Sequence, residues 1–214
     1  MEKRGVSVSP KYAKIAITLE NLEKKGIFDP SFPMLSIPFL DWFESYNWSS
    51  CSLLEFGSGN SSNYFGKRLK SVVSFETDKD FYDNLMENKE QNIRPVLISR
   101  QDIEFGKYDV EPVDIVLMDS DTNRNLSTRS CLIKFKPDVY ILDNSEWYPE
   151  TCKYLYKNGY QEIPFWGIRG EDPDEKCTSV FLKDGYRLPE KNYLFYAIGS
   201  DPGSSVHDEL RSKK

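Results

Sequence analysis

The chain has 214 residues, of which 39% are hydrophobic and 29% are charged. This length suits a single domain, and the composition supplies a sizeable core and excludes an intrinsically disordered chain. The formal net charge of −6 argues against a general binder of nucleic acid or of anionic membranes. We expect no membrane span, because no apolar run approaches the roughly 18 residues that a span needs. We also expect no signal peptide, because the N-terminal sequence MEKRGVSVSP lacks an apolar core.

The histidine and cysteine content narrows the possible chemistry. The single histidine, His207, lies in a polar stretch, which excludes a Ser-His-Asp triad, a histidine-rich zinc site and a histidine general base. The four cysteines are widely spaced and form no CxxC pair, so we expect a reduced, cytoplasmic protein. Carboxylates, hydroxyls, amides, aromatic rings or a cofactor must carry any reaction.

The predicted elements start with two helices and then alternate between strands and helices. Apolar residues at helical spacing predict a helix over residues 11–24, and a proline in the first turn favours another over residues 38–46. Short apolar stretches that are typical of buried parallel strands follow at residues 52–56, 72–76, 96–100, 114–119 and 138–142. Helices are expected at residues 62–69, 79–88, 124–135 and 149–158.

The last two predicted strands have no helix between them. They cover residues 160–166 and 178–182, with a charged loop over residues 167–176, and they predict a hairpin at the end of the sheet. The alternation before them predicts an α/β fold: an open, mostly parallel sheet with helices on both faces. Ligands of such sheets bind at the carboxyl ends of the strands.

The most informative stretch covers residues 55–60 and consists of Glu-Phe-Gly-Ser-Gly-Asn. Gly57 and Gly59 let the backbone turn sharply and approach a ligand, and Asn60 and the serines after it can cap a helix. The dinucleotide fingerprint G-x-G-x-x-G is incomplete because Ser62 occupies the third glycine position, and the G-K-[ST] of a P-loop does not follow. A tight strand-to-helix turn without a ligand is the plain alternative.

The pattern Glu55-x-Gly57-x-Gly59 resembles motif I of the class I S-adenosylmethionine (SAM)-dependent methyltransferases. Glu76, at the end of the next expected strand, supports the resemblance, because a carboxylate there can accept both ribose hydroxyls of an adenosyl group. The resemblance covers residues 50–185 and implies the Rossmann-like methyltransferase fold with seven strands. It also implies an N-terminal helical cap (1–50) and a SAM-binding methyltransferase domain (51–199). The residues after Gly199 by themselves predict a flexible tail (200–214).

The resemblance also implies a cofactor site. Glu55, Gly57 and Gly59 are expected around the methionine part and Glu76 at the ribose. Asp119 and Ser120 are expected under the reacting sulfonium. Either Gln101 or Asp102 is expected to reach the adenine. The complete implied set is Glu55, Gly57, Ser58, Gly59, Asn60, Glu76, Gln101, Asp102, Asp119 and Ser120.

Methyl transfer from a sulfonium is an in-line displacement, for which the protein supplies alignment and, with a hydroxyl acceptor, a base. Asp119 and Asp143 are the candidate catalytic bases. Together with Asn144 they resemble the metal site of catechol-type O-methyltransferases, and three oxygen ligands suit Mg²⁺. The metal-free alternative is that these side chains line the pocket or cap loops.

Polar and aromatic residues near the same strand ends are candidates for acceptor binding. Asn144, Trp147 and Trp166 form this set, because aromatic rings can stack on an acceptor, although tryptophan is also an ordinary packing residue. Residues 143–149 are similar to a bacterial group of uncharacterised methyltransferases of surface-glycan gene clusters, which implies O-methylation of a sugar or another small hydroxyl compound.

Three other functions stay open at the level of the sequence. The first is a non-catalytic protein that binds SAM or S-adenosylhomocysteine (SAH), and the second is a dinucleotide or nucleotide-sugar enzyme. The third is a nucleic-acid or protein methyltransferase, and the acidic net charge disfavours a nucleic-acid substrate. The pattern of residues predicts no particular oligomeric state.

Overall fold

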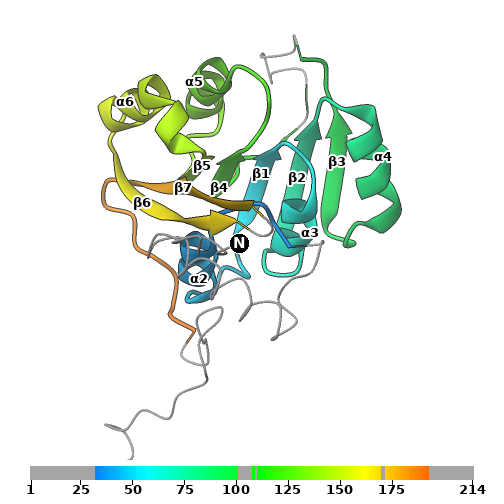
Figure 1. The fold of residues 1–214 in the computed structure, drawn as a ribbon, viewed down its shortest axis with the longest axis horizontal. Coiled ribbons are helices and arrows are strands. Elements are labelled where there is room, and N and C mark those ends of the chain that lie inside the picture. The colour runs from blue at the N-terminus through cyan, green and yellow to red at the C-terminus, as the bar shows by residue number, and fades with distance from the viewer. Residues whose placement is uncertain (1–31, 101–107, 109, 170–171, 193–214) are drawn as a thin grey trace, which may run out of the picture.

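The computed structural model describes residues 32–100, 108, 110–169 and 172–192. The expected helix over residues 11–24, the predicted tail and His207 lie outside these residues, and so do Gln101 and Asp102. The described chain forms a seven-stranded sheet in the order β3-β2-β1-β4-β5-β7-β6 (Figure 1). No helix in this described part is long and apolar enough to cross a membrane.

The sheet is parallel from β3 to β5 and closes with an antiparallel hairpin. The strands are β1 (Ser52–Phe56), β2 (Ser71–Glu76), β3 (Ile93–Leu97), β4 (Ile115–Met118), β5 (Val139–Asp143), β6 (Tyr160–Arg169) and β7 (Asp172–Lys183). The strand order reverses between β1 and β4, which makes the carboxyl ends of these strands the switch point where ligands bind in such folds. The predicted fold class is confirmed.

Predicted boundaries differ from the structure at several elements, among them the helix expected over residues 62–69, which spans Asn60–Gly66, the third strand and the final hairpin. β3 begins at Ile93, three residues before the predicted start, although Pro95 looks unfavourable for a strand. Among the described strands, β3 is an edge strand that pairs with β2 on one side, so a proline is tolerated there. Residues 167–176 are not mainly a loop, because the antiparallel ladder continues through Gly167–Lys176 and pairs Arg169 with Asp172.

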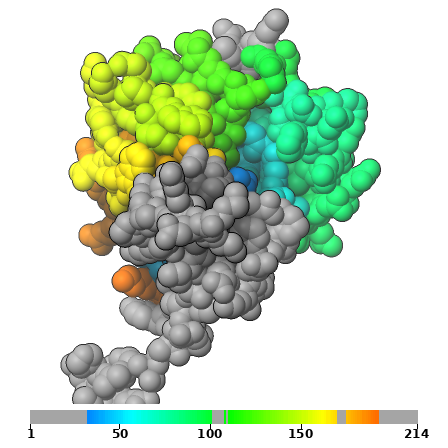
Figure 2. All heavy atoms as spheres, viewed as in Figure 1, coloured from blue at the N-terminus to red at the C-terminus, as the bar shows by residue number. Residues whose placement is uncertain are grey.

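Helices cover both faces of the sheet (Figure 1). They are α2 (Ile37–Glu44), α3 (Asn60–Gly66), α4 (Lys79–Asn88), α5 (Arg124–Lys134), the 3-10 helix η2 (Ser145–Trp147) and α6 (Pro149–Lys157). Successive β1 residues serve opposite faces, since Leu53 packs in the core under α2 and α3 whereas Leu54 packs in the core under α5 and α6. In the space-filling view of Figure 2, atoms of α5 and α6 (green to yellow) form the upper left of the surface, and atoms of α4 (teal) form its right side.

Aromatic rings attach α2 to the hairpin. The ring centroids of Phe39 and Trp42 lie 6.1 and 5.4 Å from that of Phe165 on β6. Gly167 leaves room for the ring of Pro38, because a Cβ on Gly167 would lie only 2.8 Å from the Pro38 Cγ. The described part of the predicted cap therefore packs on the sheet beside the hairpin.

Candidate functional site

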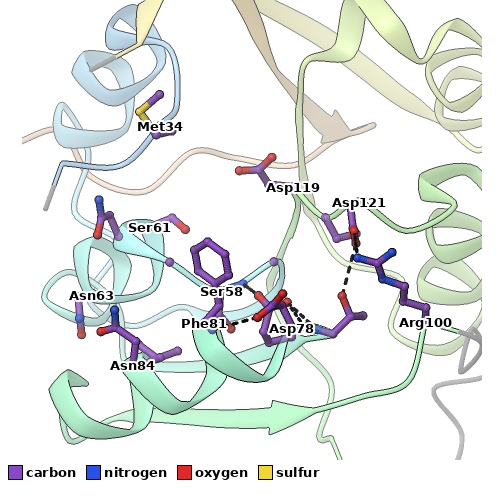
Figure 3. Close-up of a pocket in the computed structure, with 17 residues that line it drawn as sticks. Met34, Ser58, Ser61, Asn63, Asp78, Phe81, Asn84, Arg100, Asp119 and Asp121 are labelled. Carbon is purple, nitrogen blue, oxygen red and sulfur yellow. Dashed lines mark hydrogen bonds and ion pairs between the residues drawn. The ribbon is translucent and has the colours of Figure 1, made fainter. Parts of the chain in front are cut away.

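A pocket of about 460 Å³ lies at the carboxyl ends of β1, β2 and β4 (Figure 3). The loops after these strands form its floor, and α3 and α4 contribute its walls. The predicted cofactor-binding residues that line it are Gly57, Ser58, Gly59, Asn60, Glu76, Asp119 and Ser120. The structure thus brings together the ends of three strands, as the resemblance implies.

The two glycines of the loop after β1 have different structural roles. Gly57 has a φ of +95°, and a Cβ on it would lie 2.9 Å from the carbonyl carbon of Asp119, closer still to the oxygen. Gly59 has extended backbone (φ 174°), and a Cβ there would meet nothing within 4 Å. Gly57 therefore allows the loop to pack against the end of β4, whereas Gly59 borders open space in the pocket.

Glu76, the last residue of β2, binds both the loop after β1 and the turn after β2. Its Oε2 accepts a hydrogen bond from the Ser58 N–H at 2.7 Å. Its Oε1 accepts from the N–H groups of Thr77 (2.6 Å) and Asp78 (2.8 Å), and Asp78 in turn caps α4 by accepting from the Asp80 N–H. Backbone donors thus hold a buried carboxylate at the floor of the pocket.

Glu55 is fully buried under the loop and does not line the pocket. Its two carboxylate oxygens accept hydrogen bonds from the hydroxyls of Ser61, Ser62 and Ser74. Burial raises its pKa to about 7, although the three hydroxyl bonds act in the opposite direction. The structure therefore separates Glu55 from the other described residues of the predicted cofactor set.

Asp119 projects into the pocket from the end of β4 (Figure 3). Burial raises its pKa, the nearby charge of Asp143 raises it further, and Arg124 lowers it. The Arg124 guanidinium donates to Asp119 Oδ1 at 3.2 Å, to the Ser120 carbonyl at 2.7 Å and to the Asp143 carbonyl at 2.5 Å. One buried arginine therefore connects the pocket carboxylate to the ends of β4 and β5.

Asp143 is fully buried and does not line the pocket. Its Oδ1 accepts from the Thr178 hydroxyl at 2.6 Å, and its Oδ2 accepts from Arg169 Nη1 at 3.2 Å. The amide of Asn144, also buried, is placed to donate to Asp143 Oδ2 at 2.9 Å and to accept from Arg169. Of the two candidate bases, only Asp119 reaches the pocket.

The predicted Mg²⁺ ligands do not fit a metal site. Asp119 is ion-paired with Arg124, and Asp143 is ion-paired with Arg169. Two guanidinium groups occupy the positions where a cation would neutralise these carboxylates. Within the described ranges, no group of three or more histidine, cysteine or acidic side chains is arranged to hold a metal ion. The structure does not support the expected Mg²⁺ site.

The three predicted acceptor-binding residues have different environments, and none lines the pocket. Trp147 is 58% exposed and Trp166 is 56% exposed, beyond the ends of the central strands. The Lys176 ammonium lies 5.2 Å from the centre of the Trp147 indole ring. Asn144 is buried against Asp143, so its present contacts are with the protein.

Sequence reasoning missed several residues that line the pocket. Phe81, in the first turn of α4, is 58% exposed and lines one wall. Arg100 and Asp121 form an ion pair at another side of the pocket (Figure 3), and the Thr77 hydroxyl lies 3.4 Å from Asp121. The sequence does contain a signal for Phe81, which lies three residues after the helix-capping Asp78 and therefore in the first turn of α4, at the carboxyl end of β2. Asp121 was detectable as a third polar residue after β4.

No protein-family model matches the sequence, and neither does any curated protein. Solved structures share its fold. The O-methyltransferase TomG from Streptomyces achromogenes, in complex with SAM, is 15% identical, with 85% of this chain and 93% of TomG covered and a TM-score of 0.54. Aeropyrum pernix fibrillarin with natively bound SAM is 16% identical, with 68% and 72% covered and a TM-score of 0.53.

A third solved structure has a different named activity. Precorrin 8W decarboxylase from Methanobacterium thermoautotrophicum is 13% identical, with 72% of this chain and 94% of that protein covered and a TM-score of 0.51. Identities this low show the fold alone. The chain therefore has the Rossmann-like fold of class I SAM-dependent methyltransferases, and its reaction has to be argued from the pocket.

Proposed function

We propose that the chain is a SAM-dependent methyltransferase that methylates a hydroxyl group of a small molecule or sugar. The observation that carries this proposal is one pocket that joins a glycine loop, an acid at the end of β2 and an acid at the end of β4. This combination lies at the switch point of the sheet, where the fold binds ligands. TomG and Aeropyrum pernix fibrillarin hold SAM on the same fold.

The residues of the pocket suit the parts of an adenosyl cofactor. Glu76 keeps room for one ribose hydroxyl, since a carboxylate has about four acceptor positions and three backbone N–H groups occupy three of them. The exposed ring of Phe81 offers an apolar wall for a purine. Contact of Gln101 or Asp102 with the adenine remains part of the proposal by resemblance.

SAM supplies a methyl group on a positively charged sulfur, and the protein has to align an acceptor oxygen with it. Asp119 is the catalytic base in this proposal, because it projects into the pocket. Burial and the charge of Asp143 bring its pKa closer to neutral pH, where a carboxylate can take the proton of a hydroxyl. Arg124 holds this carboxylate in place.

Ligand binding tests the donor half of the proposal. We expect SAH to raise the melting temperature of the protein, whereas NAD⁺ and a UDP-sugar leave it unchanged, since a ligand at about 100 times its Kd stabilises the fold by roughly 2.7 kcal/mol. Stabilisation by NAD⁺ or the UDP-sugar alone would favour the dinucleotide or nucleotide-sugar alternative and overturn the proposal.

Transfer of labelled methyl tests the acceptor half. The protein is incubated with methyl-labelled SAM and a panel of sugars, phenols and other small hydroxyl compounds, and the label is followed into the acceptor. Label in a hydroxyl compound is the expected result. SAH binding without transfer to any acceptor class would favour the non-catalytic alternative. A cytoplasmic location and a lack of nucleic-acid and membrane partners stay predictions from the sequence.

A further inference from the structure

We infer that Glu55 is a positioning residue, whose carboxylate fixes the loop of Gly57, Ser58 and Gly59 through serine hydroxyls and does not contact the cofactor. The inference rests on the proposed function, because the loop is proposed to hold SAM. It departs from the resemblance, which places the motif I acid around the methionine part of the cofactor. Glu55 is fully buried and is not among the residues that line the pocket.

The geometry connects the carboxylate to the loop in two steps. Ser62 donates to Glu55 Oε2 at 2.5 Å and accepts from the Gly59 N–H at 3.2 Å. Ser74 donates to the same oxygen at 2.6 Å, and its hydroxyl lies 2.8 Å from that of Ser58. Each hydroxyl links Glu55 to a different residue of the loop, one through the backbone and one through a side chain.

The direction of these hydrogen bonds depends on the charge of Glu55. An ionised carboxylate only accepts, so Ser62 and Ser74 must each turn their single proton toward it. Their lone pairs then face the loop, ready for the Gly59 N–H and the Ser58 hydroxyl. A protonated Glu55 has a proton of its own to donate, and the arrangement is no longer unique. An ionised Glu55 therefore specifies one loop conformation.

The electrostatic surroundings place this change near neutral pH. Burial raises the pKa of Glu55 to about 7, and the charge of Glu76 on β2 also raises it. The charge of Asp119, the residue after β4, interacts unfavourably with that of Glu55. The helix α3, which carries Ser61 and Ser62, has no charged residue. The largest effects that favour the charged form come from hydrogen bonds of the Ser61, Ser62 and Ser74 hydroxyls. The hydroxyls are what stabilises the charge.

Binding of SAH to the full chain, measured by calorimetry, tests the inference. Ser62→Ala and Ser74→Ala are the informative variants, because neither serine lines the pocket. We expect each to weaken SAH binding about fivefold or more at pH 8, as the loss of one hydrogen bond of about 1 kcal/mol implies. Glu55→Gln should weaken it as well, and adding Ser62→Ala to Glu55→Gln should change the Kd less than twofold, because both act through one contact.

The pH dependence gives a readout that a general loss of structure would not produce. The proteins compared carry Asp119→Asn, because Asp119 lines the pocket and its pKa is also raised toward neutral pH. With Glu55 present we expect about tenfold weaker SAH binding at pH 6 than at pH 8, and with Glu55→Gln no such change. Ser52→Ala is the matched control, since Ser52 also bonds a carboxylate, that of Asp114, but at the opposite end of β1. It should bind SAH like the unaltered protein.

The outcomes separate the two proposals. If the unaltered protein binds SAH but Ser62→Ala and Ser74→Ala bind equally well, Glu55 does not act through the serines and this inference alone is overturned. Persistence of the pH dependence in Glu55→Gln would overturn it too. If the unaltered protein binds neither SAM nor SAH, the proposed function fails, and this inference fails with it.

Discussion

Gly57 packs against the backbone of Asp119: a Cβ at Gly57 would lie 2.9 Å from the Asp119 carbonyl carbon and still closer to its oxygen. This approach holds the loop after β1 against the end of β4. Gly57→Ala adds that Cβ at a φ of +95°. The variant is therefore destabilised by the steric clash with Asp119 and by a backbone conformation that alanine rarely adopts. We expect the free energy of unfolding to fall by about 3 kcal/mol or more, measured by urea denaturation.

Gly185→Ala is the control for the backbone contribution. Gly185 has a φ of +82°, and a Cβ there would meet nothing within 4 Å. We expect a loss of only about 1 kcal/mol, the cost of a left-handed conformation without a clash. Equal losses for Gly57→Ala and Gly185→Ala would show that the contact with Asp119 does not constrain the loop.

Gly59→Ala should affect ligand binding and leave stability nearly unchanged. Its extended backbone suits alanine, and the added methyl group points into open space bordering the pocket. We expect the unfolding free energy to change by less than about 0.5 kcal/mol, as for surface sites without special constraints. We expect SAH binding to weaken roughly tenfold, because the methyl group takes space that the cofactor would fill. Normal SAH affinity of this variant would show that the cofactor does not approach Gly59.

The sequence predicts the floor of this pocket well because it depends on local signals. A glycine turn after an apolar strand and acids at strand ends are visible without a structure, and parallel strands bring their carboxyl ends to one edge. The position of β3 was harder to predict, because Pro95 is acceptable only at an edge and edge position is a property of the whole sheet.

The sequence also did not show which acidic side chains at the strand ends point into the pocket. Glu55 and Glu76 both occupy ends of apolar strands, yet only Glu76 lines the pocket. The environment of Glu55 comes from Ser74 on the neighbouring strand, aligned with it by the β1–β2 register. Likewise Arg169 and Thr178 reach Asp143 from the distant hairpin. Contacts between residues so far apart in sequence have no local signature.

Asp119→Asn tests the proposed base. An amide of the same size cannot take a proton, so we expect methyl transfer to fall roughly 100-fold or more while SAH binding stays within a few-fold. The measurement is the rate of label transfer to whichever acceptor the screen identifies. A rate close to that of the unaltered protein would remove Asp119 as the base.

Asp143→Asn should act through the fold instead. Asp143 is buried and contacts Thr178 and Arg169, and removing its charge breaks its ion pair with Arg169. We expect the unfolding free energy to fall by about 3 kcal/mol, as when one member of a buried ion pair is removed. An unchanged stability with abolished methyl transfer would instead assign Asp143 a catalytic role.

Removal of divalent cations should leave the protein unaffected. Arg124 and Arg169 already neutralise the carboxylates that were expected to bind Mg²⁺. We therefore expect EDTA treatment to change neither the melting temperature nor the rate of methyl transfer. Activity lost with EDTA and restored by Mg²⁺ would contradict this expectation and reinstate a metal-assisted reaction.

Glu55 should contribute to the pH dependence of the free energy of unfolding. Its pKa is raised in the fold from 4.5 to about 7, so the folded state favours the protonated form. The resulting stabilisation is complete below about pH 4.5 and is lost as the pH rises through 7, at most about 3 kcal/mol for this difference in pKa. Glu55→Gln cannot titrate, so urea denaturation between pH 5 and 8 should show a smaller loss of stability for this variant.

Glu150→Gln, at a fully exposed glutamate, is the control and should behave like the unaltered protein. Parallel pH profiles for Glu55→Gln and the unaltered protein would show that Glu55 keeps its charge throughout this range.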